Sequence, residues 1–219
     1  MEQYFEILEK CPLFKGVERN ELLGVLKCLE VKIKEYKKGE TVFLQGDAVN
    51  FFGVVLEGSV QIVRNDYYGN RSIVTTAMPS QLFAETFAFA KASAVPLSAW
   101  ALADSAVMFI NPEKFIDQCS RACSFHSRII SNLVKVMASK NLEINKKLEI
   151  VSKRTTRDKL MTYLFLTSQE LGAKSFTVPF NRQELADYLE VDRSGLSAEI
   201  SKLKKDGKLL CRRSEFTIL

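Results

Sequence analysis

The side chains best placed for chemistry lie on a predicted helix between residues 193 and 205. Leucine and isoleucine recur there at helical spacing and give the helix an inner apolar face. The outward positions carry an arginine and small, mostly polar residues: Arg193, Ser194, Ser197, Ala198 and Ser201. Arginine can pair bidentately with guanine, and small side chains let a helix lie deep in a major groove. This face predicts recognition of double-stranded DNA.

The segments around this helix complete a predicted winged helix-turn-helix. Asn181 and Glu184 have the spacing of a capping box at the start of a first helix. A tight turn at 190–192 leads to Asp192, which can cap the second helix, and Asp206-Gly207 ends that helix. The final run LLCRRSEFTIL predicts two short strands, and its turn carries Arg212 and Arg213. Upstream, a helix from Thr156 with Gly172 as its C-cap and an edge strand in SFTVPF are expected.

Catalytic and metal chemistry find little support in the sequence. His126 is the single histidine, so mechanisms that need two histidines are excluded. A metal-dependent cupin would need clustered His and Glu ligands on its strands, but residues 31–110 contain no histidine. Cys119 and Cys123 share a helix face, but two soft ligands without a third make a poor metal site. We expect no enzyme and no metal, and leave open whether this cysteine pair has a redox role.

A heptad seam lies between Ser124 and Val151, with apolar residues spaced alternately four and three apart. Its members are Ile130, Val134, Met137, Asn141, Ile144, Leu148 and Val151. Asn141 is the polar exception, and a polar seam residue fixes register at a cost in stability. The seam predicts a homodimer through the same helix of a second copy, while a long core helix is the alternative.

Length and charge predict a two-part chain. At 219 residues it exceeds the usual single domain. Residues 1–120 hold 12 Lys and Arg against 15 Asp and Glu, whereas residues 121–219 hold 19 against 11. A basic C-terminal part indicates a polyanion partner. We expect a sensor over 1–120, a dimerisation helix over 121–152 and a DNA-binding domain over 153–219.

Neither a membrane partner nor export is expected. The sequence has no apolar run of 18 residues, and its N-terminus is amphipathic and acidic. Five cysteines without a CxxC pair suit a reducing cytoplasm.

Short β-rich runs separated by turn residues fill residues 31–110, and this spacing is typical of a jelly roll. The predicted strands are VKIKEY, TVFL, FFGVVLEG, SVQIVR, SIVTTAM and SAWALADSAVMFI. The predicted fold is therefore α+β: an N-terminal double-stranded β-helix, or jelly roll, then the long helix and the winged helix-turn-helix.

This order of motifs resembles the Crp/Fnr family of bacterial transcription regulators over essentially the whole chain. The resemblance is carried by Gly39-Glu40, Gly46-Asp47, FFGVVLEGSVQIV and LFAETFAF followed by LSAWALADSAV. It implies a cyclic-nucleotide-binding-type roll, a dimer helix and a winged helix-turn-helix. It further implies an inverted-repeat DNA operator, and RNA polymerase as a partner if the protein is an activator.

The family's cyclic-nucleotide cassette is altered in this chain. Its Phe-Gly-Glu and Arg-Ser matches are here Phe83-Ala84-Glu85 and Leu97-Ser98. A buried phosphate needs a charge-assisted partner, which leucine does not offer. We therefore expect an unknown, less anionic effector, and no certain cofactor. The expected contacts are Phe83, Glu85, Thr86, Phe87, Leu97 and Ser98.

By the same resemblance, Arg193 matches a base-reading arginine, while Ser194 and Ala198 replace the family's other two readers. Arg182 and Gln183 match positions that contact phosphate. The predicted function is a dimeric, sequence-specific DNA-binding regulator controlled by an effector in the roll. The alternative is a ligand-binding signalling module that acts through protein partners without DNA.

Overall fold

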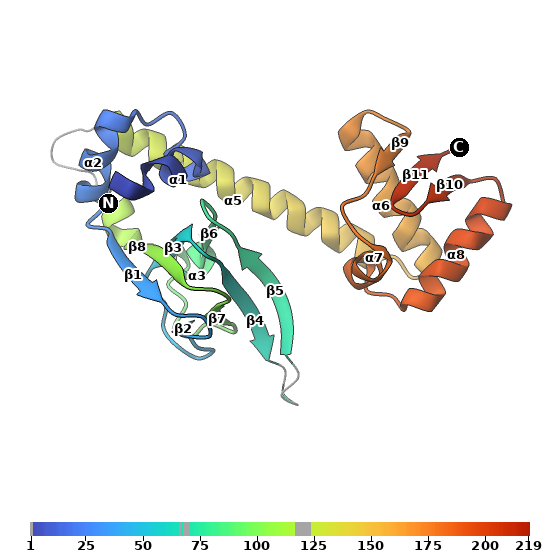
Figure 1. Cartoon of the computed structure of the whole chain (residues 1–219), viewed down its shortest axis with the longest axis horizontal. Helices are drawn as coiled ribbons and strands as arrows, with labels where there is room; N and C mark the ends of the chain where they lie inside the picture. The colour runs from blue at the N-terminus through green and yellow to red at the C-terminus, as the bar shows by residue number, and fades with distance from the viewer. Residues whose placement is uncertain (1, 66, 68–70, 117–123) are drawn as a thin grey trace. The chain divides into compact units, whose positions relative to one another are not determined.

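The computed structural model describes residues 2–65, 67, 71–116 and 124–219, and these form two compact units, Met1–Ala138 and Ser139–Leu219. Cys119 and Cys123 lie outside the described residues, as do residues 68–70, where the sequence Tyr-Gly-Asn predicts a turn between two strands. Figure 1 shows the course of the chain through both units.

The N-terminal unit begins with short helices and continues into strands. Its helices are η1 (Glu2–Tyr4), α1 (Phe5–Lys10), η2 (Pro12–Phe14), α2 (Arg19–Cys28), α3 (Glu85–Phe89) and α4 (Pro112–Ile116). Its strands are β1 (Lys32–Tyr36), β2 (Thr41–Phe43), β3 (Phe52–Glu57), β4 (Val60–Asn65), β5 (Arg71–Ala77), β6 (Leu82–Phe83), β7 (Ser98–Ala101) and β8 (Ser105–Ile110).

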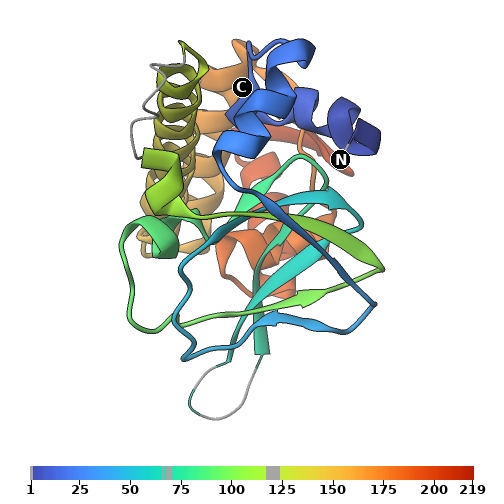
Figure 2. The ribbon, with the colours of Figure 1, turned by 90° about the vertical axis from the view of Figure 1, so that its left-hand side faces the viewer.

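The strands form two four-stranded sheets with the orders β1-β8-β3-β6 and β2-β7-β4-β5. Each of their pairings is antiparallel, and β1 pairs with the distant β8 while β2 pairs with β7. This interleaving of early and late strands is the jelly roll that the sequence predicts. Figure 2 shows the N-terminal helices at one end of the strands, and the first part of α5 (Ser124–Val151) packs into the same unit through Ile129 and Leu133.

Strand β3 is buried on both of its faces, which explains its almost unbroken apolar sequence. Phe52, Val54 and Leu56 join the core shared with the N-terminal helices and α5, whereas Val55 faces the interior of the roll. Gly53 also adjoins that interior. A Cβ atom there would lie 2.3 Å from the Cζ of Phe83, so only glycine accommodates this aromatic ring.

Two details of the strand prediction were wrong. The run SAWALADSAVMFI forms two strands, because residues 102–104 turn between β7 and β8 without glycine or proline. The Asp104 carboxylate stabilises this turn by accepting hydrogen bonds from the Lys38 backbone N–H and the Lys37 ammonium, both at 3.0 Å. Strand β6 was not predicted, since its two residues are too few to show a period.

The C-terminal unit comprises the last part of α5 and the predicted winged helix-turn-helix. Its further elements are α6 (Thr156–Leu171), β9 (Ser175–Thr177), α7 (Arg182–Leu189), α8 (Arg193–Lys205), β10 (Leu209–Arg212) and β11 (Glu215–Ile218). The strands form one antiparallel sheet in the order β10-β11-β9. As predicted, β9 is an edge strand, and Gly172 ends α6 in the left-handed conformation.

Helix α5 spans 28 residues, Ser124–Val151, which is the stretch where the sequence places the heptad seam, while residues 121–123 of the predicted dimerisation helix lie outside the described residues. Ile129 and Leu133 pack into the N-terminal core, and Ile150 packs into the C-terminal one. His126 is buried, as a packing residue would be, with its Nδ1 3.9 Å from the Cys28 sulfur. Across the described residues, no helix is both long and apolar enough to cross a membrane.

Candidate nucleic-acid interface and sensor site

Side-chain caps fix the two helices of the helix-turn-helix. The Asn181 side chain accepts hydrogen bonds from the backbone N–H groups of Gln183 and Glu184, and the Glu184 carboxylate accepts one from the Asn181 N–H in return. The Asp192 side chain caps α8 by accepting from the Gly195 N–H at 2.9 Å. Both caps agree with the sequence prediction, and they set where each helix begins.

Asp192 also accepts a hydrogen bond from the Ser194 hydroxyl. This bond and that from the Gly195 N–H hold the pKa of the Asp192 carboxyl below its ordinary value. The carboxylate is therefore charged at neutral pH, and a negative charge at a helix N-terminus is favourable. Ser194 is thus engaged with the cap that begins α8.

The predicted reading face of α8 is exposed along its whole length. The other side of the helix is anchored in the core by the buried side chains of Leu196, Ile200 and Leu203. The exposed residues are Arg193, Ser194, Ser197, Ala198 and Ser201. The hydroxyls of Ser197 and Ser201 donate to the carbonyls of Arg193 and Ser197, each at 3.0 Å. These bonds hold the two serine side chains against the helix backbone. Arg193 therefore supplies the side chain of this face that extends farthest and can donate hydrogen bonds to a partner.

Arg182 is occupied within the fold. Its guanidinium donates to the Arg213 carbonyl at 3.2 Å and to the Cys211 sulfur at 3.5 Å, and it lies over the Phe216 ring. The guanidinium therefore ties the start of α7 to the wing strands. Gln183 is exposed, and its amide donates to Asp187 one turn along the helix. The sequence did not reveal these partners of Arg182, because they depend on how the wing folds back.

The wing turn presents its two arginines to solvent. Arg212 and Arg213 are both exposed, and Arg213 has a left-handed φ of 54°, which is uncommon for a residue with a side chain. The nearby Lys204 ammonium donates to the Cys211 carbonyl at 3.3 Å. The wing thus adds cationic side chains beside the exposed face of α8 within one compact unit.

The predicted effector residues gather around α3, but mostly as packed core. Phe83, Leu97 and the partly buried Phe87 share the cluster that fills the roll. Ser98 is buried and its hydroxyl accepts a hydrogen bond from the Gln45 N–H at 2.8 Å. Thr86 is exposed on the outer side of α3. The structure therefore brings three of these side chains together and turns Thr86 away.

The entry to α3 has an unusual backbone. Ala84, the residue before the helix, is left-handed with a φ of 63°. Glycine adopts this conformation freely, whereas alanine does so at a cost. Glu85 follows at the first helical position, and only 4% of its surface is exposed. Its carboxylate is held inside the N-terminal unit at the start of the helix, where negative charge is favourable.

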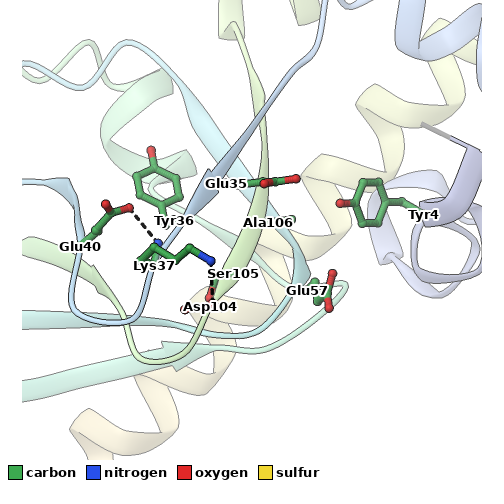
Figure 3. Close-up of a pocket in the computed structure, with 9 residues that line it drawn as sticks. All are labelled: Tyr4, Glu35, Tyr36, Lys37, Glu40, Glu57, Asp104, Ser105 and Ala106. Atoms are coloured by element: carbon green, nitrogen blue, oxygen red, sulfur yellow. Dashed lines mark hydrogen bonds and ion pairs between the residues drawn. The ribbon is translucent and has the colours of Figure 1, made fainter.

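A hollow of about 420 Å³ lies elsewhere on the N-terminal unit, against the sheet that contains β1, β8 and β3. Tyr4, Glu35 and Glu57 are among the residues that line it (Figure 3). Sequence reasoning missed this site, because its walls come from segments that only the fold brings together. Periodicity within any one of them gives no signal for it.

The predicted seam of α5 is mainly exposed in this single chain. Val134, Ile144 and Leu148 are 61, 65 and 60% exposed, while Ile130 and Met137 pack partly against the N-terminal core. The Asn141 side chain is exposed, and its oxygen accepts a hydrogen bond from the Asn145 amide at 2.8 Å. Val151, at the end of the helix, is half-buried.

Comparison with known proteins agrees with this geometry. The profile of the cyclic nucleotide-binding domain matches residues 33–122, and that of the Crp-like helix-turn-helix domain matches residues 158–219. The transcriptional activator protein FnrA of Stutzerimonas stutzeri is 24% identical over 188 residues, or 84% of this chain and 75% of that protein. A CRP-like cAMP-activated global transcriptional regulator of Mycobacterium tuberculosis is 23% identical over 207 residues, or 92% and 89%.

The fold is similar to the crystal structure of the Thermus thermophilus catabolite activator protein. The TM-score is 0.58 at 21% identity, over 95% of this chain and 93% of that one. A nucleotide-binding-type roll and a Crp-like helix-turn-helix thus occur in one chain and in the same order as in bacterial regulators. This chain belongs to the Crp/Fnr family of transcription regulators.

Proposed function

We propose that the protein is a dimeric, sequence-specific DNA-binding regulator whose DNA affinity is set by an effector held in the roll. The observation that carries the DNA-binding part is the exposed face of α8, where Arg193 stands among small side chains on a helix that is anchored from behind. Such a face can enter a major groove and place one bidentate donor at a base edge.

Charge supports a DNA partner for this unit. The exposed Arg212 and Arg213 of the wing turn can contact phosphate, and residues 121–219 carry the chain's excess of Lys and Arg. Phosphate contacts supply affinity without sequence preference, whereas base contacts supply specificity. We assign positioning on phosphate to the wing arginines and base reading to Arg193.

Selection of bound fragments from random DNA tests this function directly. We expect an inverted repeat whose half-site centres lie about one helical turn, roughly 34 Å, apart, since a dimer axis would relate two copies of α8. A consensus without two-fold symmetry would contradict the dimeric reading. Absence of any selected sequence would contradict DNA recognition itself and favour action through protein partners.

We assign the dimer contact to the seam of α5. Its exposed apolar residues recur at heptad spacing, and such a stripe is stabilised when a second helix covers it. Ile144→Asp should shift the protein toward monomer in sedimentation experiments. Leu142→Asp is the matched control, because Leu142 is 69% exposed on the same helix but lies outside the seam. Equal dissociation by both changes would contradict the seam.

We further propose that the effector is not a cyclic nucleotide. Leu97 stands where the family's phosphate-binding arginine is expected, and it packs in an apolar cluster with Phe83 and Phe87. Loss of a charge-assisted contact is worth roughly 1.5–3 kcal/mol, or about tenfold to a hundredfold in affinity. An uncharged or aromatic ligand fits such a lining better.

Calorimetric titration with cyclic AMP and cyclic GMP tests this assignment. We expect no binding at micromolar concentration of either nucleotide. Micromolar binding would overturn the argument from Leu97 and would require another cation for the phosphate. The division of labour proposed here, with sensing by residues 1–120, dimerisation by 121–152 and DNA binding by 153–219, remains a prediction.

A further inference from the structure

The contact between the end of α2 and the start of α5 brings a thiol to an imidazole. Cys28 is the last residue of α2, and His126 lies in the first turn of α5. The Cys28 sulfur is 3.9 Å from the Nδ1 atom of His126. Both residues belong to the N-terminal unit, and the proposed effector and DNA contacts use neither of them.

The burial of His126 is not explained by packing alone. Only 7% of its surface is exposed, and its buried Nε2 atom has no hydrogen-bond partner within the described part of the chain. A buried polar atom without a bond is unfavourable, and an apolar ring at this position would avoid that cost. Such exceptions in native proteins often mark a redox or catalytic role. The unsatisfied atom therefore points to a role for the other ring nitrogen, which faces Cys28.

The packing around this pair holds the two helices together. Leu26 and Leu29, at the end of α2, are buried in the same core as Ile129 of α5. The thiol and the imidazole are therefore kept close by the fold of the N-terminal unit. Their separation is long for a hydrogen bond, but bonds of this kind often tighten only when the reacting molecule is present.

The three described cysteines differ in their access to solvent and in their neighbours. Cys11 is buried, and burial raises the pKa of its thiol to about 11, so this thiol stays protonated. Cys211 is half-buried, and its sulfur contacts the Arg182 guanidinium and the Arg213 carbonyl, each at 3.5 Å. Neither of these groups acts as a base. Cys28 is also half-buried, and it lies beside an imidazole, the side chain that most often accepts a proton in proteins.

We propose that Cys28 is a peroxide-reactive thiol and that His126 takes up its proton. The thiolate, not the thiol, is the nucleophile. In the tautomer that has no hydrogen on Nδ1, this nitrogen accepts the thiol proton, and the sulfur attacks one oxygen of hydrogen peroxide. The O–O bond breaks, and the leaving hydroxide takes the proton back from the imidazolium to form water. The sulfur is thereby oxidised to a sulfenic acid, while the peroxide is reduced.

Mass spectrometry of individual peptides from the full chain tests the site. After exposure to hydrogen peroxide, alkylation with iodoacetamide measures how much of each free thiol remains, whatever the oxidised product is. We expect the Cys28 thiol to be lost about tenfold faster than that of Cys11, or more. Equal rates would overturn the proposal. Dimedone present during the reaction should label Cys28, and loss of its thiol without this label would contradict the sulfenic acid.

His126→Phe separates a chemical role of the imidazole from a structural one. Phenylalanine keeps a flat ring without a nitrogen, so loss of the Cys28 thiol should slow about tenfold or more. The unfolding midpoint in denaturant should stay the same or rise, because no buried nitrogen is left unsatisfied. Cys211, in the C-terminal unit, is the internal control, and its rate should not change.

His126→Gln provides a second variant, since glutamine is polar but cannot act as a base. It should slow the loss of the Cys28 thiol by a similar factor, so the test does not depend on how well one replacement ring fits. Circular dichroism identifies which variants are folded. An unchanged Cys28 rate in a folded variant of either kind would refute the role of His126.

Discussion

The exposed face of α8 and the surroundings of α3 present candidate ligand residues in opposite ways. On α8 the polar side chains lie in solvent, and an apolar core anchors the helix from behind. Around α3, Phe83 and Leu97 are themselves the core, at 3 and 7% exposure. The first surface can meet a partner as it stands, whereas the second must move packed side chains to admit one.

This difference predicts where substitutions act. A change on α8 should alter DNA binding and leave folding almost intact, because its exposed side chains contribute little to the core. A change around α3 should alter stability first, since each ring there fills space that no neighbour can easily take over. Four experiments test this difference.

The largest effect is expected for Phe83→Ala. Removing this buried ring leaves a cavity above Gly53, and such losses cost about 3–5 kcal/mol. Denaturant unfolding followed by circular dichroism measures the loss. Phe165→Ala is the control, because Phe165 is 55% exposed, and it should change stability by less than about 0.5 kcal/mol. Similar costs for both would remove the contrast.

Arg193→Ala should cost roughly 1–3 kcal/mol of binding free energy on the selected site and relax preference at one base pair, with stability unchanged. Arg213→Ala should weaken binding to all DNA sequences alike. It should also reduce the slope of the logarithm of the binding constant against the logarithm of salt concentration by about one. Fluorescence anisotropy at several salt concentrations measures both. Should the two variants lose specificity equally, the separation of reading and positioning residues is wrong.

Asn181→Ala should destabilise the C-terminal unit by about 1 kcal/mol, because the capping bonds to the Gln183 and Glu184 N–H groups are lost. Gln183→Ala at the same helix end removes only an exposed bond to Asp187 and should cost less than about 0.5 kcal/mol. Thermal unfolding compares them. A larger loss for the glutamine variant would show that the cap does not set the start of α7.

The smallest effect has the opposite sign. Ala84→Gly should stabilise the N-terminal unit by about 1 kcal/mol or less, since glycine relieves the left-handed backbone but is more flexible when unfolded. Ala88→Gly, inside α3, should destabilise by about 1 kcal/mol, as glycine does in a helix. If both changes destabilise, the conformation of Ala84 is not a source of strain.

Local signals explain why the helix-turn-helix could be predicted closely. The caps at Asn181 and Asp192 and the apolar spacing of α8 act within a few residues, so the sequence contains them directly. The division of residues 98–110 into β7 and β8 could not be predicted from such local signals. Its turn is held by Asp104 bonding to Lys37 and Lys38, which are distant in sequence.

Sites that depend on juxtaposition were the ones that sequence reasoning missed. The pairing of Glu35 and Glu57 about Ala106 requires the strand order β1-β8-β3, which no periodicity specifies. Likewise, Arg182 matched a phosphate-binding position, yet its guanidinium also bonds the wing. The predicted effector residues lie around α3, but their contact with an effector stays a prediction. The sequence could not distinguish a residue that lines a site from one that fills the core.

The position of β11 in its sheet bears on how the protein is made. This strand lies between β10 and β9, and its Phe216 is fully buried, although it follows every other element in the chain. A ribosome therefore synthesises all the helices of the C-terminal unit before the strand that joins its sheet. The N-terminal unit ends at Ala138 and can fold during translation, whereas the sheet of the C-terminal unit is complete only after residues 215–218 have been added.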